Sequence, residues 1–305
     1  MLGFIRALMQ GPVIAELAEK NPNIVVITQD MGGIGPFAEK FPDRFFDVGI
    51  SEANLIGVAA GLAQAGKLPF VFAMAPFITM RSFEQIRDDC GYNRNNVKII
   101  APCTGLETGA WGATHHAVED LALLRTIPGM TILCPADPEE GTRAVLASAE
   151  IDGPVYIRFG YIESLEGYED TFEIGRAPVI REGSDVAIMA TGASVAQAIK
   201  AHDILKGDGL SARVINMHTI KPIDREAIEK AATEIGRVIT VEEHFVNGGL
   251  GGAVAEVMAE LGRGRLVRLG LQDEFVMEVA SYPEILGLVG LDGESIAASA
   301  RTMLE

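Results

Sequence analysis

Short, largely apolar runs rich in β-branched residues recur along the chain, and they constrain its fold more than any other feature. Asn23–Thr28 (NIVVIT), Val97–Ala101 (VKIIA) and Met130–Cys134 (MTILC) are examples. Such runs are typical of strands that are covered on both faces, which occur mainly in parallel sheets. Segments with helical periodicity separate them, so the sequence predicts an α/β fold in which mostly parallel sheets lie between two layers of helices.

A change in composition divides the chain into two series of alternating strands and helices. Residues 161–183 are acidic and glycine-punctuated and show no clear periodicity, so we interpret them as a linker. They separate a first three-layer domain, residues 1–160, from a smaller second one, residues 184–305. The length of 305 residues fits about two domains of ordinary size. Within the first domain we expect helices at Glu52–Ala65 and Arg81–Cys90.

Composition and charge disfavour several functions. The chain has 25 Lys and Arg against 42 Asp and Glu, and a formal charge of −17 argues against binding to nucleic acid or to anionic membranes. Three cysteines without a CxxC spacing argue against a disulfide framework or a zinc site. The apolar stretch Leu68–Met80 contains two prolines and is too short to span a bilayer. The first ten residues do not read as a signal peptide, so we expect a cytoplasmic protein.

Two carboxylates stand where a site could form. Glu52 is the only charged residue of its predicted helix, and it opens that helix. It either stabilises the helix N-terminus or sits in a dry pocket where it can pass a proton near neutral pH. Asp30 ends the first predicted strand at the carboxyl edge of the sheet, where open α/β sheets hold ligands.

Three strings follow one another in the first half of the chain: 49–63 (GISEANLIGVAAGLA), Met74–Tyr92 (MAPFITMRSFEQIRDDCGY) and Gly112–Arg125 (GATHHAVEDLALLR). Together they resemble the pyrimidine-binding domain of thiamine diphosphate enzymes, and specifically the C-terminal half of a transketolase. Thr219–Asp224 (TIKPID) and Thr240–His244 (TVEEH) are similar to the C-terminal domain of the same family. The resemblance covers nearly the whole chain.

The resemblance implies a role for several residues. In the family the glutamate at the position of Glu52 bonds N1′ of the cofactor's aminopyrimidine and activates the cofactor, and Phe77 matches the ring that stacks on that pyrimidine. Asp30 and Met31 match positions near the thiazolium region, with Met31 as an apolar wedge that holds the cofactor bent. His115 matches the histidine that contacts the reacting hydroxyls of the substrate and assists proton transfer.

The substrate side departs from the family pattern. Cys103 stands where many transketolases carry a histidine that touches the sugar phosphate, and Trp111 stands where they carry an aspartate. The phosphate-binding arginine of the family falls near Tyr161, whereas Arg158 lies slightly earlier and is the candidate replacement. We therefore expect His115, Cys103, Trp111 and Arg158 to contact the substrate, and no metal ligand on this chain.

A complete transketolase is about twice as long, with a diphosphate-binding domain in front. The resemblance thus implies a split transketolase that moves a two-carbon ketol unit from a ketose or ketose phosphate to an aldose. It implies thiamine diphosphate, Mg²⁺ held by a separate N-terminal-half subunit, and an α₂β₂ heterotetramer or a homodimer of this chain. Alternatives are the β subunit of a 2-oxo acid dehydrogenase, a 1-deoxyxylulose-5-phosphate synthase-like enzyme and a non-catalytic paralogue.

Overall fold

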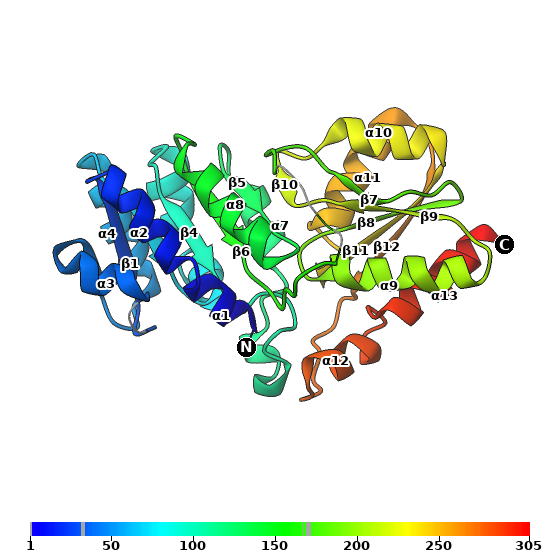
Figure 1. Cartoon of the computed structure of the whole chain (residues 1–305), viewed down its shortest axis with the longest axis horizontal. Helices are drawn as coiled ribbons and strands as arrows, with labels where there is room; N and C mark the ends of the chain where they lie inside the picture. The colour runs from blue at the N-terminus through cyan, green and yellow to red at the C-terminus, as the bar shows by residue number, and fades with distance from the viewer. Residues whose placement is uncertain (1, 32–33, 167, 169–171) are drawn as a thin grey trace.

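The computed structural model describes residues 2–31, 34–166, 168 and 172–305. Two twisted sheets lie side by side, one built mainly from the first half of the chain and one from the second (Figure 1). The first has seven strands in the order β10-β5-β6-β4-β3-β1-β2, and the second has five in the order β12-β11-β8-β9-β7. Each sheet is parallel except for one antiparallel edge strand. The predicted fold class, two α/β domains with mostly parallel sheets, is confirmed.

The first half holds six strands and most of the short helices. Its strands are β1 (Ile24–Thr28), β2 (Phe45–Asp47), β3 (Leu68–Phe72), β4 (Lys98–Ala101), β5 (Thr131–Leu133) and β6 (Val155–Arg158). Its α-helices are α1 (Leu2–Leu8), α2 (Gly11–Lys20), α3 (Pro36–Lys40), α4 (Glu52–Gln64), α5 (Ala75–Arg81), α6 (Phe83–Gln85), α7 (Asp120–Arg125) and α8 (Pro138–Ala149). Short helices of other types occur at η1 (Pro42–Arg44), η2 (Ile86–Tyr92), η3 (Gly109–Trp111) and η4 (Ala113–His115).

The second half packs helices on both faces of its sheet. Its strands are β7 (Val179–Arg181), β8 (Val186–Ala190), β9 (Ala212–Asn216), β10 (Thr219–Lys221), β11 (Arg237–Phe245) and β12 (Arg265–Leu271). Its helices are α9 (Ser194–Gly207), α10 (Arg225–Glu234), α11 (Leu250–Leu261), α12 (Tyr282–Leu288) and α13 (Gly293–Leu304). Helices α10 and α11 cover one face, and α9 and α13 cover the other (Figure 1).

The β-branched runs become the central strands because both of their faces are buried. In β1 every residue is buried, and Val26 packs in one core cluster while its neighbour Ile27 packs in the other. Side chains of successive strand residues point to opposite faces, so a strand between two helix layers needs apolar residues at every position. This is the pattern that the sequence carries.

Three elements differ from the sequence expectation. The predicted linker 161–183 contains the edge strand β7, which pairs antiparallel with β9. Strand β10 lies in the second half of the chain but joins the first sheet beside β5, so the two halves share a sheet. The predicted helix Arg81–Cys90 is broken: α5 ends at Arg81, and the segment continues through α6 into the π-helix η2.

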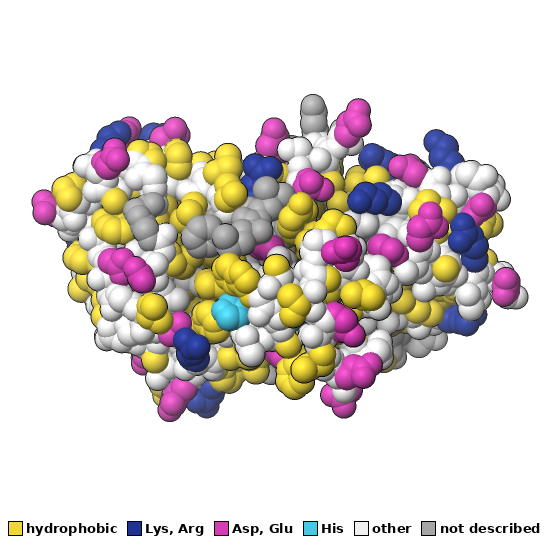
Figure 2. All heavy atoms as spheres, turned by 90° about the horizontal axis from the view of Figure 1, so that it is seen from below, with side chains coloured by type: hydrophobic (Ala, Val, Ile, Leu, Met, Phe, Trp, Pro, Cys, Tyr) yellow, Lys and Arg dark blue, Asp and Glu magenta, His cyan; other side chains and the backbone are white. Residues whose placement is uncertain are grey.

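Acidic side chains are spread over the surface, whereas hydrophobic side chains gather in the middle of the face seen in Figure 2. Large hydrophobic side chains that are exposed include Ile50, Trp111, Phe275, Met277 and Val279. Within the described part of the chain, no helix has the length and apolar character needed to cross a membrane.

A buried clamp of three residues, Asp120, Arg158 and Glu243, joins the two halves. The Arg158 Nε lies 2.8 Å from Asp120 Oδ2, and its Nη2 donates to the carbonyl oxygens of Ala117 and Glu243, each at 3.0 Å. Glu243 in turn accepts from the Leu106 amide at 3.1 Å. The clamp therefore ties β6, α7 and the loop after β4 to strand β11 of the second half.

Removing the acid of the clamp is expected to destabilise the chain strongly. Asp120→Asn leaves the buried Arg158 guanidinium without its counter-charge, which costs about 3–5 kcal/mol of unfolding free energy. The matched control is Asp208→Asn, which removes a half-exposed ion pair with Arg301 and costs about 1 kcal/mol or less. Urea unfolding measures both, and equal losses would contradict the role of the clamp.

Beside the clamp, Glu242 caps the start of α11. Its carboxylate accepts from the amides of Leu250 at 2.6 Å and Gly251 at 2.7 Å. Burial raises the pKa of Glu242 to about 7, although these two backbone hydrogen bonds oppose the shift. Burial likewise raises the pKa of Glu140, on α8, to about 7.

The raised pKa values predict a stability that falls as pH rises from about 4.5 to about 7. Over that range the folded chain holds protons on Glu242 and Glu140 that the unfolded chain has released, so the unfolding free energy decreases with increasing pH. One such group contributes at most about 3 kcal/mol. Thermal or urea unfolding from pH 5 to pH 8 measures the slope. Glu242→Gln should make that slope shallower, and an unchanged slope would contradict the assignment.

Candidate active site

The candidate site forms where neighbouring parallel strands end. Strands β1, β2 and β3 are parallel neighbours, so the segments that follow them start at the same edge of the sheet. Residues 29–31 follow β1, the loop that leads into α4 follows β2, and Met74 lies just after β3. This carboxyl edge is where open α/β sheets bind their ligands.

A cavity of about 380 Å³ opens at this edge. Four of the residues predicted from the sequence line it, and four further residues complete the lining. The complete lining is Gln29, Asp30, Met31, Ile50, Glu52, Met74, Phe77 and Arg81. The structure therefore brings together the whole set predicted to bind a cofactor, although its members are spread along the sequence from Asp30 to Phe77.

Glu52 is the first residue of α4, and only 5% of its side chain is exposed. Its Oε1 lies 2.9 Å from Nη1 of Arg81, whose side chain is 55% exposed. The position at a helix start allows a favourable interaction with the helix dipole, but burial in a cavity wall goes beyond what that interaction requires. A buried acid that faces a cavity can bind a hydrogen-bonding ligand there.

An aromatic row leads from the cavity to the neighbouring loop. The Phe77 ring contacts the His115 ring edge-on at 5.4 Å between centroids, and His115 contacts Trp111 in the same way at 5.2 Å. The Thr114 hydroxyl lies 3.0 Å from His115 Nδ1 and fixes the orientation of the imidazole. His115 and Trp111 thus lie beside the cavity, linked to its wall through the Phe77 ring.

Cys103 and Arg158, predicted to contact the substrate, do not line the cavity. The Cys103 side chain is fully buried, and burial raises the pKa of its thiol to about 12, which keeps it unreactive. Arg158 is held in the buried clamp by Asp120 and by two backbone carbonyl groups. We therefore retain neither as a substrate ligand.

Sequence reasoning assigns no role in the site to Arg81 or Asp47, yet both contribute to it. Arg81 lines the cavity; its place four residues after Phe77 on one helix is the available signal, because such residues share a face. Asp47 Oδ1 accepts from the amides of Asp30 and Gly49, each at 2.9 Å. It thereby joins the two loops that carry Asp30 and Glu52, and no motif points to it.

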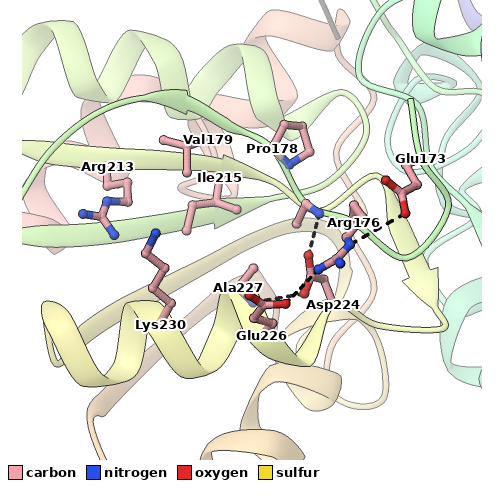
Figure 3. Close-up of a pocket in the computed structure, with 11 residues that line it drawn as sticks. Glu173, Arg176, Pro178, Val179, Arg213, Ile215, Asp224, Glu226, Ala227 and Lys230 are labelled. Atoms are coloured by element: carbon pink, nitrogen blue, oxygen red, sulfur yellow. Dashed lines mark hydrogen bonds and ion pairs between the residues drawn. The ribbon is translucent and has the colours of Figure 1, made fainter. Parts of the chain in front are cut away.

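A second cavity, of about 340 Å³, lies in the other half of the chain between β7, β9 and α10 (Figure 3). Most of its charged side chains already have partners; for example, Arg176 pairs with Glu226 at 2.8 Å, and Asp224 accepts from the Ala177 amide at 2.7 Å. The residues that line it include none of those predicted to be functional. The cavity at Glu52 is therefore the candidate site.

A buried glutamate and an aromatic ring in one cavity, at the carboxyl edge of a parallel sheet, fit the pyrimidine-binding half of a thiamine diphosphate enzyme. The carboxylate offers an acceptor for a ring nitrogen that carries a proton, and the Phe77 face offers a stacking surface. Among the described residues, no group of three or more His, Cys, Asp or Glu side chains is arranged to hold a metal ion. The expectation that the Mg²⁺ ligands lie on a partner stays a prediction.

Two family models match the chain. The transketolase pyrimidine binding domain matches residues 7–162, and the transketolase C-terminal domain matches residues 175–296. This chain belongs to the transketolase family, and it corresponds to the C-terminal half of a transketolase.

Relatives of similar length support this assignment. Over 294 residues the chain is 42% identical to one of the subunits of the apulose-4-phosphate transketolase of Phocaeicola vulgatus, covering 94% of this chain and 93% of the relative. It is 38% identical to the 6-deoxy-6-sulfo-D-fructose transketolase subunit SqwH of a Clostridium species, covering 96% and 92%. A solved structure described as a split gene transketolase, inactive beta4 tetramer, matches with a TM-score of 0.89 and 42% identity, covering 99% of this chain and 98% of that one.

Proposed function

We propose that this chain is the cofactor-activating subunit of a two-subunit transketolase. The reaction moves a two-carbon ketol unit from a ketose or ketose phosphate to an aldose acceptor. The observation that carries the proposal is the placing of Glu52 and Phe77 in the wall of one cavity, beside the loop of His115 and Trp111. Relatives named as transketolase subunits favour this function over a 2-oxo acid dehydrogenase subunit or a non-catalytic paralogue.

Each residue of the site has a task in this proposal. Thiamine diphosphate supplies the nucleophilic carbon when it is bound. Glu52 would bond N1′ of the aminopyrimidine and hold a proton there, and Phe77 would offer its face to that ring. Asp30 and Met31 line the same cavity and would hold the thiazolium end of the cofactor. His115 moves a proton at a substrate hydroxyl group, and Trp111 narrows the path by which the substrate reaches the cavity.

The site on this chain needs a second subunit to complete it. Ile50 and Arg81 line the cavity and are largely exposed, as Trp111 is beside it. The outer face of α4 carries Gly57 and Gly61, and a Cβ atom added at either glycine would meet nothing within 4 Å. A face of small residues allows another chain to approach closely. We propose that an N-terminal-half subunit, with the Mg²⁺ and diphosphate ligands, covers this side in a twofold α₂β₂ assembly.

The three cysteines support an intracellular setting for this assembly. Cys90, Cys103 and Cys134 are all buried and none forms a disulfide. Free thiols in such numbers are typical of a reducing compartment. We propose that the enzyme works in the cytoplasm.

Replacing the proposed proton carrier is expected to stop the reaction without preventing assembly. Glu52→Gln keeps the size of the side chain but cannot exchange a proton, so turnover should fall by about 10²-fold or more. The assay uses the chain co-expressed with its N-terminal-half partner, with ketose phosphates, free ketoses and pyruvate as donors. Size-exclusion chromatography checks assembly.

The control for this experiment is Glu256→Gln. Glu256 also pairs with an arginine, Arg125, at 2.7 Å, but it is 65% exposed and lies outside the cavity. It should retain turnover close to that of the wild type. If Glu52→Gln behaves like this control, the proposed mechanism is wrong.

Cofactor affinity tests the division of the site between two chains. The isolated chain should bind thiamine diphosphate at least about tenfold more weakly than the assembled complex, because the proposed ligands of the diphosphate group lie on the partner. Calorimetry compares the two. Trp111, the only tryptophan of the chain, gives a fluorescence signal next to the site for the isolated chain. Equal affinity of the isolated chain and the complex would contradict the split site.

A further inference from the structure

Arg81 makes two contacts that are unusual for a half-exposed side chain. Its Nη1 donates to Glu52 Oε1 at 2.9 Å, and its guanidinium carbon lies 4.3 Å above the centroid of the Phe77 ring. A guanidinium group is flat, rich in N–H donors and able to stack on an aromatic face. Arg81 therefore contacts the Glu52 carboxylate and the Phe77 ring at the same time.

These two contacts are the ones that the proposed function assigns to the aminopyrimidine. A pyrimidine that stacks on Phe77 and bonds to Glu52 needs the ring face and the carboxylate oxygen that Arg81 now covers. We propose that Arg81 is a placeholder: it occupies the aminopyrimidine position before the cofactor binds, and it has to swing out for the cofactor to enter. This inference rests on the proposed function of the cavity.

The position of Arg81 allows such a movement. It is the last residue of α5, and 55% of its side chain is exposed, whereas Glu52 is 5% exposed. A half-exposed ion pair is weak because water screens it, so a ligand with better contacts can displace it. Glu52 and Phe77 stay in the cavity wall while the long arginine side chain rotates into solvent.

A placeholder lowers the apparent affinity for whatever replaces it. If the cavity is open for only a fraction of the time, the measured dissociation constant is the intrinsic one divided by that fraction. An ion pair and a cation–π contact of this exposure shift the balance by about three- to tenfold. Removing Arg81 should therefore tighten cofactor binding by about that factor.

The test measures thiamine diphosphate binding to the assembled two-subunit complex by calorimetry. Arg81→Ala should bind about three- to tenfold more tightly than the wild type. Arg81→Lys keeps the positive charge but loses the flat stacking group, so its affinity should lie between the two. The control is Arg87→Ala, which removes an exposed arginine that pairs with Asp88 outside the cavity and should leave the affinity unchanged.

The outcomes separate this inference from the proposed function. If the wild-type complex binds no thiamine diphosphate, the function of the cavity is wrong and the placeholder with it. If the wild type binds and Arg81→Ala binds equally well or more weakly, the placeholder alone is wrong, and weaker binding identifies Arg81 as a residue that holds the cofactor. Circular dichroism and thermal unfolding of each variant confirm that the complexes compared are folded.

Discussion

The ion pair between Arg158 and Asp120 is the interaction on which the arrangement of the site depends. The Arg158 guanidinium also donates to the carbonyl oxygen of Ala117, at the end of the loop that carries Trp111 and His115. Glu243 holds the start of the loop through the Leu106 amide, and it also accepts a hydrogen bond from Tyr282. The second half of the chain therefore holds the loop that carries Trp111 and His115, although its described residues stay out of the cavity lining.

Fixing this loop matters because the part that carries Trp111 and His115 is short and not fully buried. Trp111 and His115 lie in single helical turns, η3 and η4, which have little packing of their own. Cys103 opens the loop with a φ of +63°, a conformation that costs energy for a residue other than glycine. The cavity residues match the family pattern, whereas Cys103 and Trp111 on the neighbouring loop depart from it. The two ends of this loop are held by buried hydrogen bonds.

Sequence patterns predicted what burial and periodicity determine. The strands β1, β4 and β5 followed from apolar runs, and the cavity residues Glu52 and Phe77 followed from motif resemblance. The edge strands β7 and β10 were missed because each has only three residues and pairs on one side, so neither needs a continuous apolar run. The buried position of Arg158 escaped prediction for a related reason: its direction is set by Asp120, 38 residues earlier, and no local pattern contains such a contact. The same limit hid the second partner of Arg81, because its hydrogen bond to Glu52 spans 29 residues.

In the proposed two-subunit site, two groups of this chain would cost free energy in the free subunit, before the partner and the cofactor cover them. A carboxylate that is 5% exposed is costly without a partner, and an aromatic face open to water is costly as well. Arg81 relieves both costs at once by donating to Glu52 and covering Phe77. The carboxylate and the ring of the cavity therefore already contact a flat, nitrogen-rich cation of the chain's own.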